Sequence, residues 1–132
     1  MRRLILAAAF AAVFVAPNFA APAFAAETVP FQQAAFTQAQ AANKPILIEI
    51  DASWCPVCAQ QRPILAKLSA DPAFRDLIIM KVDFDTQKDV VRAMGAQMQS
   101  TLIAFHGAAE RGRSAGETDA AAIRALVDKT NS

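Results

Sequence analysis

Three short runs of apolar, largely β-branched residues constrain the fold of this chain more than any other feature. Each run has the length and composition of a strand that is covered on both faces of a sheet. The runs lie at residues 46–50, 77–82 and 101–105. Helical segments separate them, so the first strands are expected to pair in parallel through right-handed crossovers.

Four segments carry the spacing or the boundary residues of helices. They lie at residues 31–42, 56–69, 86–94 and 119–129. Residues 107–116, with three glycines among charged residues, are typical of a hairpin turn followed by a short polar edge strand. A strand joined to its neighbour by so short a turn must be antiparallel to it. The order predicts an α/β protein whose mixed four-stranded sheet has helices on both faces.

The beginning of the chain belongs to a different class from the rest. Two arginines precede an uncharged apolar run at residues 4–16, and small residues follow at 23–25. This is the layout of a secretory signal peptide, and we expect cleavage after Ala25. An uncleaved membrane anchor is the alternative, although a span needs about 20 apolar residues. We therefore expect residues 1–25 to be a signal peptide and residues 26–132 to form one domain in the periplasm.

Composition excludes several classes of protein. Thirteen basic residues against 12 acidic ones give a net charge of +1, which is too weak a positive field for a nucleic-acid-binding protein. A hydrophobic fraction of 55% argues against disorder. Two cysteines are too few for a disulfide-stapled miniprotein or for a four-cysteine zinc site within one chain.

The two cysteines, Cys55 and Cys58, lie where the first strand run meets the second helix. Two residues between them bring both sulfurs close together, so the dithiol and the disulfide can interconvert without large backbone motion. Cys55 at the helix N-terminus faces unpaired N–H groups and the positive end of the dipole, which favour a reactive thiolate. Cys58 is one turn further in, and we expect it to be the more covered, resolving thiol.

A Cys-x-x-Cys pair has two other possible roles. A structural disulfide of this spacing closes too small a loop to stabilise the fold much through chain entropy. A mononuclear zinc site needs two more ligands, and the chain offers carboxylates and one histidine, His106, which we expect to face solvent at a strand end. The strand–loop–helix context favours redox chemistry, with no metal and no organic cofactor.

The motif and its surroundings resemble the thioredoxin family. The residues that carry the resemblance are Trp54-Cys55-Pro56-Val57-Cys58 after a β-branched strand, Pro63, Gly95, Gly116 and the strand end Lys81-Val82-Asp83-Phe84-Asp85. The resemblance spans essentially all of residues 26–132. It implies a thioredoxin fold and a thiol–disulfide oxidoreductase.

The resemblance also implies roles for individual residues. Glu49, six residues before Cys55, falls where thioredoxins have a buried acid, and it would relay the proton of Cys58 during exchange. The alternative is that Glu49 faces outward or pairs with a lysine. The residues implied to contact a protein substrate are Trp54, Pro56, Val57, Gln99, Ser100 and Thr101.

Three positions depart from the family's pattern. Thioredoxins have a cis-proline before the third core strand, and this chain has Gln99-Ser100-Thr101 instead. The loop could still pair with a substrate peptide, could be relaxed, or could leave room for a metal or iron–sulfur cluster shared by two chains. Asp51 replaces a usual aromatic residue and is expected to alter the local electrostatics. Pro56-Val57 replaces Gly-Pro between the cysteines and leaves the redox direction undecided.

We therefore expect an exported thiol–disulfide oxidoreductase in which Cys55 attacks a partner disulfide, Cys58 resolves the mixed disulfide and Glu49 assists. By resemblance we favour a reductase over an oxidase. The expected partners are client proteins with paired cysteines and a membrane thiol donor or oxidant, with no nucleic acid, and the chain is expected to be a monomer. Two alternatives are a metal- or cluster-binding dimer that uses the same cysteines and a non-catalytic polypeptide-binding module.

Overall fold

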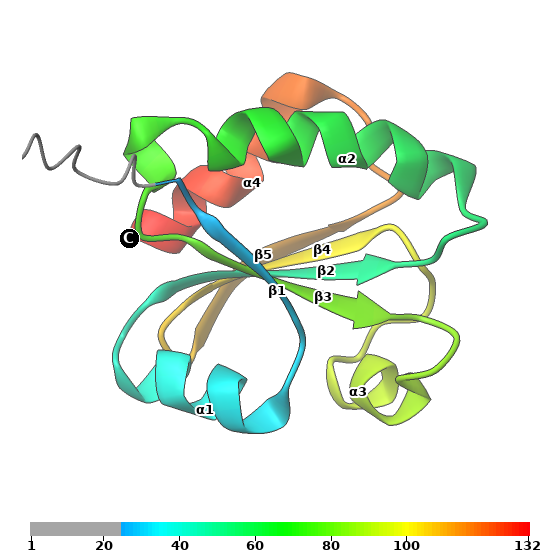
Figure 1. Cartoon of the computed structure of the whole chain (residues 1–132), viewed down its shortest axis with the longest axis horizontal. Helices are drawn as coiled ribbons and strands as arrows, with labels where there is room; N and C mark the ends of the chain where they lie inside the picture. The colour runs from blue at the N-terminus through cyan, green and yellow to red at the C-terminus, as the bar shows by residue number, and fades with distance from the viewer. Residues whose placement is uncertain (1–24) are drawn as a thin grey trace, which may run out of the picture.

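The computed structural model describes residues 25–132, which form one sheet between two layers of helices (Figure 1). The strands are β1 (Glu27–Pro30), β2 (Pro45–Asp51), β3 (Ile78–Asp83), β4 (Thr101–His106) and β5 (Ala109–Ala115). The α-helices are α1 (Gln33–Ala41), α2 (Pro56–Ser69), α3 (Lys88–Ala93) and α4 (Ala120–Asp128), with short 3₁₀ helices at Pro72–Phe74 and Lys129–Asn131. Within residues 25–132, no helix is both long enough and apolar enough to cross a membrane. The signal-peptide prediction falls almost entirely outside the described residues.

The sheet has the strand order β1-β3-β2-β4-β5. β3 pairs in parallel with both β1 and β2, whereas β4 is antiparallel to β2 and to β5. The predicted mixed sheet with helices on both faces is therefore confirmed. The expected count of four strands was wrong, because the described sheet has five.

The additional strand is β1, at the edge of the sheet beside β3. Its sequence is Glu-Thr-Val-Pro, which is too short and too polar to stand out as a strand. Pro30 lacks an N–H, and an edge strand tolerates this because one of its sides has no partner. The strand exists because its long-range pairing with β3 supplies hydrogen bonds that the local sequence does not reveal.

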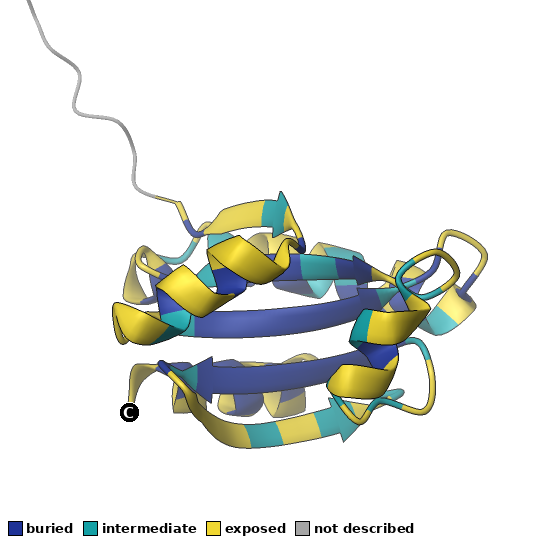
Figure 2. Ribbon diagram, turned by 90° about the horizontal axis from the view of Figure 1, so that it is seen from below, coloured by how far each residue is buried: buried dark blue, intermediate teal, exposed yellow. Residues whose placement is uncertain are grey.

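Alternate residues of β2 enter two different cores. Ile46, Ile48 and Ile50 pack on the side of α1 and α3, together with apolar residues of β3 and β4. Leu47 packs on the side of α2 and α4, among Leu65, Leu68 and residues of the closing helix. Figure 2 shows the central strands buried between the two helical layers. Helices on both faces explain why the β2 sequence is an almost unbroken apolar run.

Helix α2 begins and ends where the sequence predicts, at Pro56 and Ser69. Its buried residues recur at helical spacing, so one face of the helix lies against the sheet. At its far end, the backbone N–H of Ala26 donates to the carbonyl oxygen of Ser69 at 2.8 Å. The helix therefore runs from the Cys-x-x-Cys motif to the start of the folded domain.

Candidate active site

Cys55 is the N-cap residue of α2, directly after a turn that follows β2. Its Sγ accepts a hydrogen bond from the backbone N–H of Cys58 at 3.1 Å, and its own N–H donates to the carbonyl of Ala52 at 3.2 Å. Pro56 occupies the first turn, where the missing N–H breaks no helical bond. The helix N-terminus therefore directs a backbone donor and its positive end at this sulfur, which favours negative charge there.

Both cysteines are free thiols, and both are buried. Cys55 is 2% exposed and Cys58 1%, so both thiols are almost completely covered and Cys58 is the more covered by only a small margin. The two residues and Ala52 form a small cluster against the half-buried side chains of Val57 and Phe84. A partner disulfide can reach the sulfur of Cys55 only by fitting closely to this surface or by moving it.

Burial raises the pKa of the Cys58 thiol to about 12, with a smaller increase from its hydrogen bond with Cys55. The backbone at Ala52 lowers this pKa slightly, and the negative charge of Asp51 adds to the increase. Cys58 therefore keeps its proton at neutral pH. A group that accepts this proton is needed before Cys58 can attack a mixed disulfide.

Glu49 lies on the α2 side of β2, where it is 4% exposed. Burial raises the pKa of its carboxyl group; Lys81 and Arg62 oppose the increase and Asp51 adds to it. Among residues 25–132, no hydrogen bond or ion pair engages this carboxyl group, and none joins it to Cys58. Glu49 instead lines a pocket of about 230 Å³ beneath α2, with Arg62 and Lys81. The side chain is buried as expected, and it pairs with no lysine.

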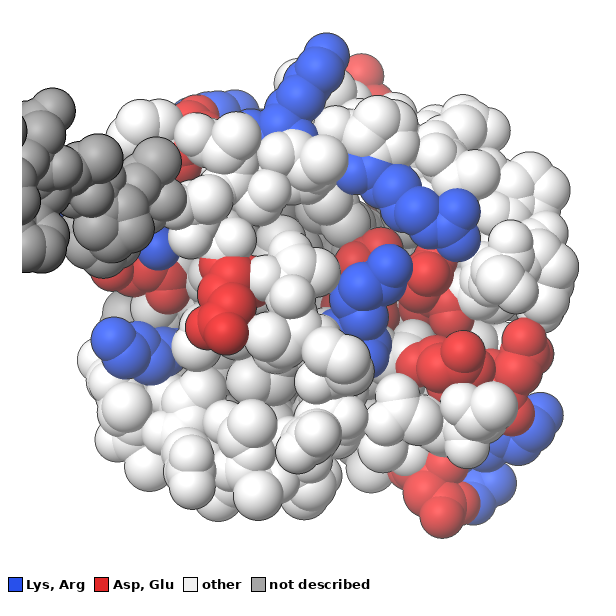
Figure 3. Space-filling model, in the orientation of Figure 1, with Lys and Arg blue, Asp and Glu red and all other residues white. Residues whose placement is uncertain are grey.

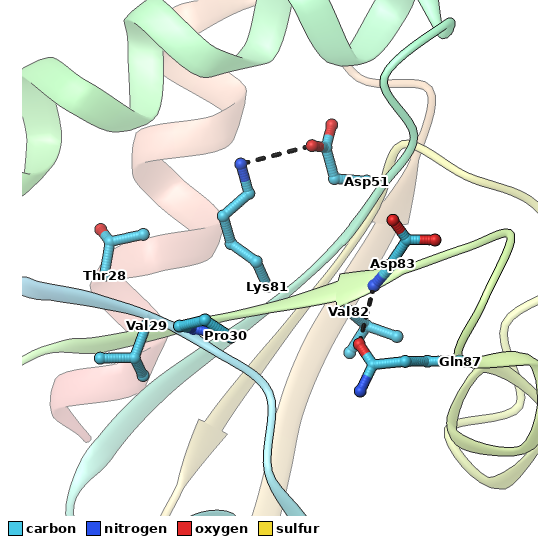
Figure 4. A pocket seen from close by; sticks show the side chains of 8 residues that line it. All are labelled: Thr28, Val29, Pro30, Asp51, Lys81, Val82, Asp83 and Gln87. Atoms are coloured by element: carbon cyan, nitrogen blue, oxygen red, sulfur yellow. Dashed lines mark hydrogen bonds and ion pairs between the residues drawn. The ribbon is translucent and has the colours of Figure 1, made fainter.

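Asp51 holds the two cations that would otherwise be available to Glu49. Its carboxylate accepts from Arg62 Nη2 at 3.0 Å and pairs with Lys81 Nζ at 3.3 Å. Lys81 is the register neighbour of Glu49 on β3, but its side chain extends along the sheet to Asp51 (Figure 4). Arg62 also donates to the carbonyl of Ala52, 3.0 Å away, in the turn before Cys55. Asp51 thus connects α2, β3 and the redox turn.

Lys81 and Asp51 also line a second pocket. This pocket has a volume of about 350 Å³, and Figure 4 shows the eight side chains around it. They come from β1, from the ends of β2 and β3, and from Gln87 before α3. On the face of the molecule drawn in Figure 3, acidic and basic side chains are interspersed, so no charge of one sign dominates.

Two large apolar side chains are exposed in the described part of the chain, Trp54 (56%) and Met98 (40%). Trp54 directly precedes Cys55, and its Nε1–H donates to Asp85 Oδ2 at 2.8 Å, which fixes the indole at the surface. Met98 lies in the loop before β4. Pro56, which is exposed, and Val57, which is half-buried, follow Trp54 and Cys55 in sequence. Exposed apolar side chains next to a reactive group are typical of a surface that contacts another polypeptide.

The loop at Gln99-Ser100-Thr101 follows a course that the sequence did not reveal. No cis peptide bond occurs among the described residues, and Ser100 has a φ of 59°, in the left-handed region. The N–H of Ser100 donates to the carbonyl of Ile50 at 2.8 Å, which holds the loop against the end of β2. Ser100 is 0% exposed and Thr101 3%, so of the three predicted substrate-binding residues in this loop only Gln99 lies at the surface.

A sequence profile of the thioredoxin family, described as Thioredoxin, matches residues 27–129, which is most of the chain and all of the site above. The chain belongs to the thioredoxin family. The thioredoxin of Mycobacterium tuberculosis strain H37Rv is 32% identical to it over 93 residues, which cover 70% of this chain and 79% of the relative.

Two solved structures agree with this assignment. The crystal structure of Trxlp from Edwardsiella tarda EIB202 has 44% sequence identity and a TM-score of 0.75, covering 76% of this chain and 98% of that one. The thioredoxin of Malassezia sympodialis has 22% identity and a TM-score of 0.70, covering 82% of this chain and 95% of that one, and so supports the fold alone. The predicted thioredoxin fold and family are confirmed.

Membership in the thioredoxin family makes the chain a thiol–disulfide oxidoreductase whose substrates are protein disulfides. The predicted enzyme class is therefore confirmed. The family assignment does not favour the alternative of a metal or iron–sulfur cluster at the cysteines.

His106 lies at the end of β4 away from the cysteine turn, and it is half-buried rather than facing solvent. Its Nε2 lies 3.1 Å from Asn43 Nδ2 and its Nδ1 lies 2.7 Å from the carbonyl of Thr130. Both ring nitrogens therefore have partners within the fold.

The effect of Asp51 on the local electrostatics was expected from the sequence, but its pairing with Arg62 and Lys81 was not. One residue of this thioredoxin site, Gln61, was missed. Gln61, a buried glutamine among the apolar residues of α2, gave one signal: a polar residue at the buried spacing of Cys58, Leu65 and Leu68. Its partners lie far away in sequence, so no local pattern could have identified them.

Proposed function

We propose that this thioredoxin-family protein is an exported, monomeric reductase of protein disulfides in the periplasm, re-reduced by a membrane thiol donor. The geometry at Cys55 carries the chemical part of the proposal. Its sulfur caps α2 and accepts the Cys58 N–H, whereas Cys58 keeps its proton with a pKa of about 12. Cys55 is therefore the attacking thiol and Cys58 the resolving thiol.

In the first step, the Cys55 thiolate attacks one sulfur of a client disulfide. A Cys55–client S–S bond forms, the client S–S bond breaks, and the departing client thiolate takes a proton. Cys58 then loses its proton and attacks the Cys55 sulfur, which releases the second client thiolate. Two electrons have passed to the client, which leaves as a dithiol, and the enzyme holds a Cys55–Cys58 disulfide.

Glu49 is the proposed acceptor of the Cys58 proton. Its raised pKa suits it to exchange protons nearer neutral pH than an ordinary carboxylate. No hydrogen bond joins it to Cys58 in the described structure, so we propose that water carries the proton between them. Glu49 lines a pocket of about 230 Å³ together with Arg62 and Lys81, which is large enough to hold water.

The reductase direction is supported by the names of the relatives, which are thioredoxins, and by Asp51. The negative charge of Asp51 disfavours the thiolate of Cys58, so the reduced enzyme gains less stability from ionisation and gives up its electrons more readily. Export is supported by the residue pattern of positions 1–25. Strand β1 begins at Glu27, so cleavage after Ala25 would leave every strand and helix of the described domain in place.

Reduction of insulin disulfides tests the activity. Wild type should turn over, Cys55→Ser should lose all activity, and Cys58→Ser should accumulate a mixed disulfide with the client. Binding without exchange by the wild type would show a polypeptide-binding module instead. Equilibrium of the Cys55/Cys58 couple with glutathione tests the direction, since a potential as high as that of strong oxidants would contradict a reductase.

The N-terminal sequence of protein recovered from a periplasmic fraction tests export. We expect it to begin at Ala26. Protein that retains its first residues and remains with the membrane would show an anchor instead. Sedimentation of the recovered protein tests the monomer.

A further inference from the structure

We propose that Gln61 is a positioning residue that fixes the substrate-binding loop at Gln99 from the redox helix, and so sets the preference of the enzyme for polypeptide disulfides. The inference rests on the proposed function, because it concerns which disulfides the same cysteines reduce.

Gln61 lies one helical turn after Cys58 on the buried face of α2. It is 1% exposed, and its amide Nε2 donates to the carbonyl of Ser100 at 3.1 Å and to the carbonyl of Glu117 at 2.8 Å. Both hydrogens of one buried amide are therefore used on two loops that are distant in sequence. A buried carbonyl that loses its donor is costly, so these contacts hold the loops in place.

The first of these loops needs such support. Ser100 has a φ of 59°, a conformation that residues with a Cβ rarely adopt, and it is completely buried. A residue stays in this region only when its surroundings determine it strongly. Three hydrogen bonds do so: Ser100 N–H to Ile50, Gln61 to Ser100 and Gly116 N–H to the Ser100 carbonyl at 3.0 Å.

The left-handed conformation of Ser100 affects the preceding residue, Gln99. Gln99 is half-buried at the surface, and its backbone N–H makes no hydrogen bond to any residue of the described domain. An extended client chain can use such a donor for strand-like main-chain pairing. Met98, an exposed apolar side chain, lies next to it and adds contact area.

Gln61 therefore links the position of the redox helix to the position of the Gln99 donor. A small disulfide needs only access to the Cys55 sulfur. A polypeptide disulfide also needs the main-chain contact at the correct distance from that sulfur. Loss of Gln61 should therefore affect the two kinds of substrate differently.

The test compares Gln61→Met, which keeps the length of the side chain but removes the amide, with Gln60→Met. Gln60 is an exposed neighbour on the same helix and receives the same substitution. Rates are measured with insulin and with a small dipyridyl disulfide. For Gln61→Met we expect the insulin rate to fall about tenfold, through KM, while the dipyridyl rate stays within about twofold. For Gln60→Met neither rate should change.

Equal losses with both disulfides, or no loss with either, would overturn the proposal. If Gln61→Met fails to fold, Gln61→Asn gives the same comparison, because it keeps the amide but is too short to reach both carbonyls. Wild type that reduces neither disulfide would contradict the proposed function rather than the role of Gln61.

Hydrogen exchange reports on whether the loop is held in place, independently of any activity assay. The Gly116 amide, which donates to Ser100, should exchange at least about tenfold faster in Gln61→Met than in wild type or Gln60→Met. Unchanged exchange at Gly116 would show that Gln61 does not hold the loop.

Discussion

The two faces of the sheet are built from the same strands and differ in what they bury. On the α1/α3 side, β2 contributes Ile46, Ile48 and Ile50 to a core that is apolar throughout. On the α2/α4 side, Leu47 is followed by two acids, Glu49 and Asp51, as the strand approaches the cysteines. One face therefore stabilises the fold, and the other gives up part of that stability to place charges beneath the redox helix.

The two acids on the α2/α4 side of the sheet differ in whether they have partners. Asp51 is satisfied by Arg62 and Lys81, whose side chains are each 37% exposed, so this pair remains close to water. Glu49, two residues earlier, is buried with no partner within residues 25–132. The difference indicates that an acid used for structure finds its cations, whereas an acid proposed for proton transfer is left unpaired.

The largest effect is expected when an acid is placed in the apolar core on the α1/α3 side of the sheet. Ile48→Glu places a carboxyl group among apolar side chains, and it should destabilise the fold by about 4 kcal/mol or more. Urea denaturation measures the change. A loss as small as about 1 kcal/mol would show that the two faces do not differ as described.

The converse change removes the acid from the polar face. Glu49→Leu should stabilise the protein by about 2 kcal/mol at neutral pH, because a buried, unpartnered carboxyl group is replaced by an apolar side chain. It should also slow insulin reduction, since the proposed proton acceptor is lost. Denaturation and turnover of the same preparation give both results.

The pH dependence of this stabilisation has a definite sign. The pKa of Glu49 in the folded protein is raised above its ordinary value of 4.5, so wild type loses stability as the pH rises from there through the folded value. The advantage of Glu49→Leu should therefore grow over this range and then level off. An advantage that shrinks with rising pH would contradict the direction of the shift.

A smaller effect is expected at Asp51. Asp51→Asn removes a negative charge near Glu49 and Cys58 and releases Lys81, so the pKa values of both groups should fall. Stability should decrease by about 1 kcal/mol or less, because both cations are partly exposed. Carbon NMR titration of Glu49 and Cys58 measures the shifts. Asp85→Asn, an exposed acid bonded to Trp54, is the control and should leave them unchanged.

The smallest effect is expected in the loop that Gln61 supports. Ser100→Gly removes the Cβ from a left-handed residue and should stabilise the fold by about 0.5 kcal/mol, because the greater freedom of glycine in the unfolded chain offsets part of the gain. Thermal unfolding measures it. A clear loss of stability would show that the Ser100 side chain contributes more than its backbone conformation costs.

These two faces also explain how much of the molecule could be predicted from its sequence. The buried strands and the helix at residues 56–69 were predicted because their signals are local: β-branched runs, helical spacing and boundary residues. Strand β1 was missed because four residues of mixed polarity acquire a partner only from β3. The sequence therefore predicted the buried strands of the apolar side, but it did not predict the edge strand β1.

The site divides in the same way. The Cys-x-x-Cys motif was predicted from its spacing where a strand meets a helix, and the buried acid was predicted from the resemblance of its position to the thioredoxin family. Asp51 reaches a lysine 30 positions along the chain, and Gln61 reaches Ser100 39 positions along. Such contacts depend on how the elements pack, as do the burial of Cys55 and the left-handed conformation of Ser100.

The N–H of Ala26 donates to the carbonyl of Ser69, the last residue of α2, so this bond lies at the end of the helix opposite to Cys55. If the leader is removed after Ala25, the nitrogen that now donates to Ser69 as an amide becomes a terminal ammonium. A full positive charge would then sit at the negative pole of the helix whose positive pole faces Cys55. Maturation of the precursor would in this way strengthen the anchorage of the redox helix at the end remote from its chemistry.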